Sequence, residues 1–375
     1  MLYSHDINTD PSVGHRLLRH RPFKGRFSFK YQGALLTRSY SKPHLPYDQQ
    51  LQTMAARGMH YSDRGVALRA LKRVGYYRLS AYSYPFRAPL NLNEPRGGAD
   101  GRSDAFLPGT DFSSVLALYD FDRKLRAILA DALECLEIGL AVQIGYVAGK
   151  RDPFVHLMRA HLDEAACSAT DRDNPKLDVH EGWLQRYDKH QRDARNEDFV
   201  KHFILNYEGE LPIWAATEVM SFGSLVRLYS LLQPSDRKKI AKNLGVSDGA
   251  LLHGWLLSLN VLRNHCAHHG RVWNRVMAYA PARIKPNLVS MNLRHLGSLT
   301  EAKRPKLYFM AALLAQLVIQ IDPDTNWPRN FVGVMKKFPA MEGMTPQNSM
   351  GFPEKWLAES LWAYDPHAWR RQQTD

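Results

Sequence analysis

The sequence predicts an all-α fold, a helical bundle with few if any strands. Several long stretches carry apolar residues at the α-helical period of about 3.6 residues. Asp or Ser precedes several of these stretches and Gly follows some of them, as at the ends of helices. The chain has 375 residues, of which 45% are hydrophobic, so it can bury a sizeable core in one large or two modest domains.

The first predicted helices lie in residues 42–110, which we expect to form an additional N-terminal helical segment. One helix runs over Tyr47–Gly58, and its terminal glycine is the predicted stop. A second helix runs over Arg64–Val74, with Asp63 as its cap.

An aromatic run follows, over Tyr76–Phe86. Its tyrosines lie near Arg78 and Arg87 and could stack on RNA bases. Aromatic residues at helical spacing more often pack in a core or a dimer interface, and we expect packing here. Leu90–Gly109 is rich in Pro, Gly and Asp and is predicted to be a loop.

The helical core is predicted to span residues 111–325. Its first helix covers Val115–Val147, with Asp111 or Ser113 as its cap, because the apolar positions of this stretch keep the α period. The polar stretch Lys150–Gly209 should form helices on the solvent face.

The last predicted helix of the core covers Lys306–Ile321, which is almost entirely apolar. Residues 326–375 form a tail with little periodicity. We expect this tail to pack on the core through its tryptophans, Trp356, Trp362 and Trp369.

Acidic residues on the core helices need partners. Glu134 and Glu137 are expected to form ion pairs with arginines, since no histidine or further acid flanks them. Glu218 lies in an apolar run and should also be paired. Arg263 or Arg271 is one candidate partner, which would let Glu218 organise a site, and an unrelated local ion pair is the other.

The most informative stretch is Val261–Arg275, which contains two asparagines, three histidines and three arginines. It is predicted to be helical throughout, with Ser247 or Asp248 as the cap, because its apolar residues lie on one stripe. A second stripe has amides, an imidazole and guanidinium groups but no carboxylate, which suits an anion such as phosphate. That stripe consists of Asn260, Asn264, His268, Arg271 and Arg275.

The spacing of Arg263, Asn264 and His268 suits RNA cleavage. Histidine can move protons near neutral pH, arginine can stabilise the phosphorane charge, and the asparagine can orient the ring or a phosphate oxygen. Arg263 lies about 140° from His268 round an ideal helix, so only its long stem lets the two converge. The reaction needs both a general acid and a general base, and one histidine per chain cannot fill both roles. A symmetric dimer would supply a second histidine.

A zinc site is the alternative for His265, Cys266 and His269. Cys266, however, falls on the apolar stripe, and no second pair of ligands stands at zinc spacing. We therefore expect neither a metal nor a cofactor.

Arg263-Asn264-x-x-x-His268 resembles the R-x4-6-H signature of HEPN-superfamily ribonucleases. The longer string LRNHCAHHGRVWNR resembles abortive-infection proteins of the AbiD/AbiF type. The resemblance extends from about Lys42 to Trp362, and four further blocks follow the family's order. These blocks are GYYRLSAYSYPFR, LYDFDRKLR, LPIWAATEVMSFGSL and MGFPEKW.

The resemblance implies a HEPN-like helical core and a metal-independent endoribonuclease toxin of abortive phage defence. Such an enzyme would cleave RNA by 2′-OH transesterification at a composite dimer site. His268 would be the general acid/base, Arg263 the clamp on the phosphorane, and Asn264 a positioning group. An early helix of such bundles often lends a polar group to the site, and the candidates here are Asp120, Asp122 and Arg123.

The resemblance leaves open whether His268 or His269 is the main catalytic imidazole. Further residues that would act in catalysis, bind RNA or orient the site are His269, Arg271, Asn274 and Arg275, with Glu218 as described above. The second hypothesis is a non-catalytic RNA-binding HEPN module, controlled by a cognate non-coding RNA or an antitoxin protein.

The formal net charge of +13 favours a polyanionic partner, with nucleic acid first. Residues 1–41 form a basic extension, expected to be flexible, which either grips the RNA backbone or is an upstream start without function. Three widely spaced cysteines fit a reducing compartment. Without a long apolar run or a secretory signal, we expect a cytoplasmic protein that does not enter a membrane.

Overall fold

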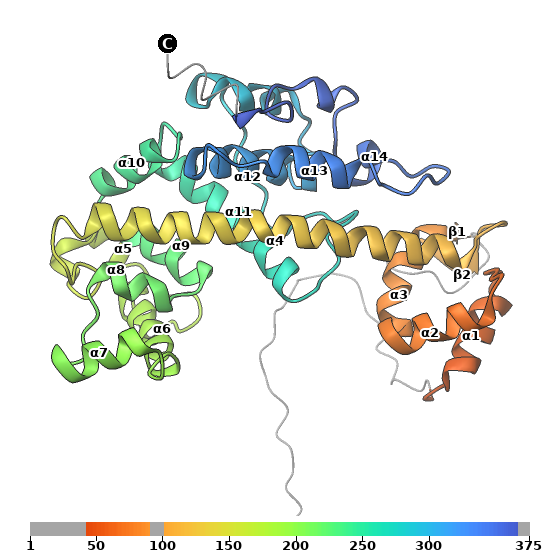
Figure 1. Ribbon diagram of the computed structural model, residues 1–375, viewed down its shortest axis with the longest axis horizontal. Coiled ribbons are helices and arrows are strands. Elements are labelled where there is room, and N and C mark those ends of the chain that lie inside the picture. Colours follow the sequence, from red (N-terminus) through yellow and green to blue (C-terminus); the bar gives the residue numbers. More distant parts are fainter. Residues whose placement is uncertain (1–42, 91–100, 367–375) are drawn as a thin grey trace, which may run out of the picture. The chain divides into compact units, whose positions relative to one another are not determined.

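The computed structural model describes residues 43–90 and 101–366. Its central element is α4 (Phe112–Ala148), a helix of 37 residues. The helix begins where the carboxylate of Asp111 accepts a hydrogen bond of 2.7 Å from the N–H of Ser113, so the predicted cap is confirmed. Figure 1 shows α4 as the long yellow helix along which other helices are arranged.

Seven α-helices pack against α4, as does one 3-10 helix. The fold is all-α, as predicted, and the described residues from 45 onward form one compact unit. The contacting α-helices are α3 (Tyr76–Ser83), α8 (Ile213–Ala216), α9 (Phe222–Leu231), α10 (Pro234–Asn243), α11 (Gly249–Ala267), α12 (Leu307–Ile321) and α13 (Trp327–Met335).

The first two helices agree with the sequence prediction. α1 spans Tyr47–Ala56 and is followed by Gly58, whose φ of 95° is a conformation that few residues other than glycine adopt. α2 spans Arg64–Val74, and the Asp63 carboxylate accepts a hydrogen bond from the N–H of Val66 at 2.9 Å. α1 packs on α2, α2 on α3, and α3 on α4.

A short antiparallel pair of strands borders the predicted loop Leu90–Gly109, with one strand just before it and the other inside it. β1 (Arg87–Pro89) pairs with β2 (Arg102–Phe106), with Arg87 opposite Phe106 and Pro89 opposite Arg102. It is the only sheet among the described residues. Its strands are too short for an alternating pattern, and one contains proline, so the sequence has no strand signal here.

The polar stretch after α4 forms three helices, as predicted: α5 (Glu164–Cys167), α6 (Val179–Asp193) and α7 (Asp198–Asn206). α6 begins with a capping box between Asp178 and Glu181. Between these helices and α9 lies a buried cluster of His156, His180, Trp183 and Tyr187.

α12 is buried along almost its whole length, from Leu307 to Ile319. The tail has little periodicity in its sequence, yet it contains α13 and α14 (Pro346–Met350). Trp356 and Trp362 are buried, in agreement with packing of the tail on the core, whereas Trp369 lies outside the described residues. The basic extension, residues 1–41, also lies outside them.

Six 3-10 helices complete the described secondary structure. None of the described helices is both long and apolar enough to cross a bilayer. The 3-10 helices are η1 (Tyr84–Phe86), η2 (Arg159–His161), η3 (Thr217–Val219), η4 (Pro286–Leu288), η5 (Met291–Ser298) and η6 (Trp356–Ala358).

Candidate functional site

The helix that carries the Arg-Asn-His spacing ends earlier than its sequence predicts. α11 begins at the cap Asp248, whose carboxylate accepts a hydrogen bond from the N–H of Leu251 at 2.8 Å. It ends at Ala267, so the prediction of a continuous helix to Arg275 is wrong.

A Schellman motif stops α11. His269 has a φ of 55°, in the left-handed region where histidine is one of the few enriched residues other than glycine. Its N–H donates to the carbonyl of Cys266 at 3.2 Å, and the N–H of Gly270 donates to the carbonyl of His265 at 2.8 Å. The chain therefore leaves the helix direction at the two histidines.

The polar stripe predicted on one helix face is consequently divided between two structures. Asn264 is exposed on α11, and the exposed His268 is its C-cap. Arg271 and Arg275 lie on the segment that follows, which we call the site loop (residues 268–275). Asn274 is also on this loop, exposed and with a φ of 48°.

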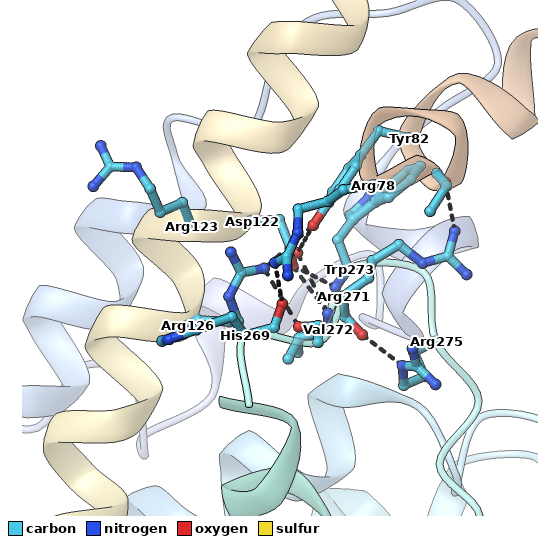
Figure 2. Close-up of polar contacts among 12 residues, drawn as sticks. Arg78, Tyr82, Asp122, Arg123, Arg126, His269, Arg271, Val272, Trp273 and Arg275 are labelled. Carbon is cyan, nitrogen blue, oxygen red and sulfur yellow. Dashed lines mark hydrogen bonds and ion pairs between the residues drawn. The ribbon is translucent and has the colours of Figure 1, made fainter. Parts of the chain in front are cut away.

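A buried carboxylate holds the site loop in place. Asp122 of α4 is completely buried and accepts hydrogen bonds from the N–H groups of Val272 (3.2 Å) and Trp273 (2.6 Å). It also accepts a hydrogen bond from the hydroxyl of Tyr82 at 2.6 Å and pairs with Arg126 one turn along α4. Figure 2 shows these groups converging on Asp122.

Three arginines connect the site loop to α3 and α4 through main-chain carbonyls. Arg78 of α3 donates to the carbonyl of His269 at 2.7 Å, and Arg126 donates to that of Gly270 at 3.4 Å. In the other direction, Arg271 of the loop donates to the carbonyl of Ala81 in α3 at 2.9 Å. The histidines are thus carried by a loop that α3 and α4 hold on both sides (Figure 2).

The neighbours of Asp122 have a different environment. Asp120 and Arg123 form a surface ion pair of 3.8 Å, and Arg123 points away from the network in Figure 2. Of the three candidates on the early helix, only Asp122 reaches the loop. Sequence reasoning missed Arg78, Tyr82 and Arg126; the available signal was Asp122 and Arg126, four residues apart among the apolar positions of α4.

One side of the site loop borders an open cavity of about 440 Å³, which we call the arginine-lined cavity. No carboxylate occurs among the described residues that line it. Such a wall is suited to an anion with several oxygen atoms. Its polar and aromatic lining includes Tyr77, Arg78, Tyr84, His268, His269, Arg271 and Arg275.

A second cavity of about 540 Å³ borders the other side, and we call it the glutamate-lined cavity. Here Nε of Arg263 lies 3.2 Å from a carboxylate oxygen of Glu137, which confirms that Glu137 pairs with an arginine. Glu134, Glu218 and His269 also line this cavity, so His269 borders both cavities.

Glu218 is not the partner of Arg263. Its side chain is exposed on η3 and forms no ion pair with any residue that the structure describes. The expectation that this glutamate is paired is therefore wrong, because the 3-10 turn directs it to solvent and Glu137 occupies Arg263 instead.

The remaining residues of the motif, His265 and Cys266, are partly or fully buried. Cys266 is buried, and burial raises the pKa of its thiol to about 12. Burial also lowers the pKa of His265, with Arg275 and His268 acting in the same direction. Among residues 43–90 and 101–366, no group of three His, Cys, Asp or Glu side chains could hold a metal ion.

A family model described as "Abi-like protein" matches residues 69–274. The matched segment runs from α2 to Asn274 and so contains α3, α4, α11 and nearly all of the site loop. No curated protein and no solved structure matches the chain.

Proposed function

The chain belongs to the Abi-like protein family, and we propose that it acts in abortive infection as an endoribonuclease that cleaves RNA without a metal ion. One observation carries the proposal. Two exposed histidines end α11, with Arg263 in the cavity on one side and the arginine-lined cavity on the other. Imidazole and guanidinium groups are the side chains that RNA transesterification requires.

In the proposed reaction, an imidazole removes the proton of a ribose 2′-hydroxyl, and the 2′-oxygen attacks the adjacent phosphorus. The bond from phosphorus to the 5′-oxygen breaks, and that oxygen takes a proton from an imidazolium. The products are a 2′,3′-cyclic phosphate and a 5′-hydroxyl, so atoms and protons balance without a further reactant. The negative charge on the phosphorane requires a nearby guanidinium group.

The cavities support distinct roles for the two histidines. Arg263 shares the glutamate-lined cavity with His269, and five residues separate them, which also satisfies an R-x4-6-H spacing. His268 borders only the arginine-lined cavity. We assign His269 to proton transfer beside Arg263 and His268 to the second proton or to RNA positioning, with Asn264, Arg271 and Arg275 as positioning and binding groups.

A second copy of the chain would add the same groups from across a twofold axis. The surface that we assign to this contact is the α4 row, Ile138, Val142 and Tyr146, which are one turn apart and each more than half exposed. Exposed Trp214 extends the row, and Ile138 also lines the glutamate-lined cavity.

Charges beside the α4 row make it complementary to itself. Lys150 lies at one end, over the ring of Tyr146 at 4.2 Å. At the other end, beside Ile138, Glu134 forms no ion pair among the described residues. In an isologous dimer, each lysine would face Glu134 of the other copy, and the apolar rows would cover each other.

The Arg263–Glu137 pair favours a second candidate function. A guanidinium that is bound to a carboxylate has less charge to offer a phosphorane, as would suit a protein that binds RNA without cutting it. Cleavage products distinguish the two functions, because binding alone leaves no new RNA ends.

The test is induced expression of the wild type and of Arg263→Ala, His268→Gln and His269→Gln, with growth and total RNA ends followed. We expect growth arrest and new 2′,3′-cyclic phosphate ends with the wild type. His269→Gln and Arg263→Ala should abolish both, whereas His202→Gln, on the exposed face of α7, should not. Cleavage by His268→Gln and His269→Gln at the wild-type rate would exclude this site.

A further inference from the structure

The tyrosines of the α3 region have different environments. Tyr82 is buried and donates to Asp122, and the hydroxyl of Tyr76 accepts a hydrogen bond from Arg57 at 3.2 Å. The ring of Tyr84 lies 5.5 Å from the guanidinium carbon of Arg87. Tyr77 alone among these four is strongly exposed, at 91%. Packing therefore accounts for the other three tyrosines and leaves Tyr77 unexplained.

Tyr77 lines the arginine-lined cavity, next in sequence to Arg78, and His268 and Arg275 line it too. The α3 backbone that carries Tyr77 is held to the site loop by the Arg78–His269 and Arg271–Ala81 hydrogen bonds. Arg78 and Arg275 each direct one N–H to a main-chain carbonyl, and a guanidinium has five N–H donors. Donors remain for an anion in the cavity.

An exposed aromatic ring beside guanidinium groups is the arrangement that binds a single strand of nucleic acid. The ring offers a face to an unpaired base, and the cations bind the neighbouring phosphate. A duplex offers the same phosphates, but its base faces are stacked on each other and cannot reach a side chain.

We propose that Tyr77 stacks on an unpaired base while Arg78 and Arg275 hold the adjacent phosphate, so that this cavity selects single-stranded RNA. The proposal rests on the proposed function in one respect, that RNA is the ligand of this site. It adds the class of RNA and a residue outside the Arg-Asn-His motif that recognises it.

The test measures binding of the full chain to a fluorescent single-stranded oligonucleotide and to a duplex of the same length. Both carry 2′-O-methyl groups, which remove the nucleophile and prevent cleavage. We expect the wild type to prefer the single strand by at least about tenfold. Tyr77→Ala should lose about tenfold or more in affinity for the single strand and little for the duplex, whereas Tyr77→Trp should stay near the wild-type affinity.

Tyr207→Ala is the matched control, because Tyr207 is also an exposed tyrosine but lies beyond α7, away from this cavity. Thermal unfolding of each variant confirms that it is folded. Equal affinity of the wild type for single strand and duplex, or equal behaviour of Tyr77→Ala and Tyr207→Ala, would overturn the proposal.

Cleavage of unmodified RNA by the wild type separates the two proposals. Tyr77-dependent binding without cleavage supports single-strand recognition and excludes the nuclease. Cleavage of duplex and single strand alike, independent of Tyr77, supports the nuclease and excludes this recognition.

Discussion

The N–H of Trp273 donates a 2.6 Å hydrogen bond to the carboxylate of Asp122, joining residues that are 151 positions apart in the chain. The same carboxylate accepts from Val272, Tyr82 and Arg126, so one buried charge is compensated by α3, α4 and the site loop together. Buried charges are tolerated when several donors satisfy them. Asp122 thereby determines where the two histidines stand.

Replacement of Asp122 by Asn should displace the site loop. The amide has a single carbonyl oxygen, and its NH2 group would face backbone donors, while Arg126 would lose its buried counter-ion. We expect unfolding free energy to fall by about 3 kcal/mol and RNA cleavage to fall at least about tenfold. Urea unfolding and a cleavage assay measure both.

Asp120→Asn is the control for this change, since it alters a partly exposed ion pair two residues away on the same helix. Its effect should stay below about 0.5 kcal/mol. If Asp122→Asn proves as stable and as active as Asp120→Asn, the role given to the buried carboxylate is incorrect.

Glu137→Gln should strengthen RNA binding, because it releases the guanidinium of Arg263 from its ion pair. We expect a gain in affinity of about two- to fivefold and a steeper dependence of affinity on salt, by about 0.7 in the logarithmic slope for a single strand. A salt series of binding measurements with 2′-O-methyl RNA tests this. Glu134→Gln removes a charge from the same cavity without freeing Arg263 and should give a smaller gain; the reverse order would argue against the pairing as the cause.

Val142→Glu should convert a dimer into a monomer, since it places a carboxylate in the middle of the α4 row of both copies. Light scattering during size-exclusion chromatography gives the mass directly. Leu205→Glu, at an exposed aliphatic side chain on α7, should leave the dimer intact. A monomeric wild type, or a dimer that tolerates Val142→Glu, would remove the α4 row as the contact surface.

His156 should make the protein sensitive to mild acid. Its ring is buried against Tyr187 and Trp183, neither ring nitrogen has a partner among the described residues, and burial lowers its pKa to about 4 from 6.5, with His180 acting in the same direction. Below pH 6.5, His156 binds a proton in the unfolded chain but remains neutral in the folded chain until the pH approaches 4. Stability should therefore be complete above pH 7 and decrease by roughly 3 kcal/mol between pH 6.5 and 4.

Thermal or urea unfolding across this pH range measures the loss. His156→Leu should flatten the curve and be more stable than the wild type at pH 5, whereas His202→Leu, with an exposed ring, should follow the wild type. An unchanged pH profile for His156→Leu would assign the acid sensitivity elsewhere.

The starts of three helices with capping aspartates could be predicted from the sequence to within about three residues. Asp63, Asp111 and Asp248 each bind the first turn of a helix, and such contacts are local. The end of α11 could not be predicted in this way. Trp273 fits the apolar period of the helix and is buried in the core, but it belongs to the site loop. The hairpin and α13 were missed because their local signals are short: β1 has three residues and α13 has nine.

The site shows the same limit. Its residue types were evident, since the motif groups arginines and histidines within a few positions. Its pairings were not evident, because the partners are distant in the sequence. Asp122 lies 150 residues before Val272 of the site loop, and Glu137 lies 126 residues before Arg263. Contacts over such separations arise from tertiary packing, and the periodicity of the sequence does not predict them.

The burial of α12 has a consequence for attempts to trim the protein. The family model ends at residue 274, yet α12 begins only at Leu307 and covers α4 with side chains that are buried from Leu307 to Ile319. A fragment ending near residue 274 would leave that side of α4 as an exposed hydrophobic surface, and large exposed hydrophobic surfaces promote aggregation. The smallest portion that stays in solution must therefore keep α12, although none of its side chains belongs to the site.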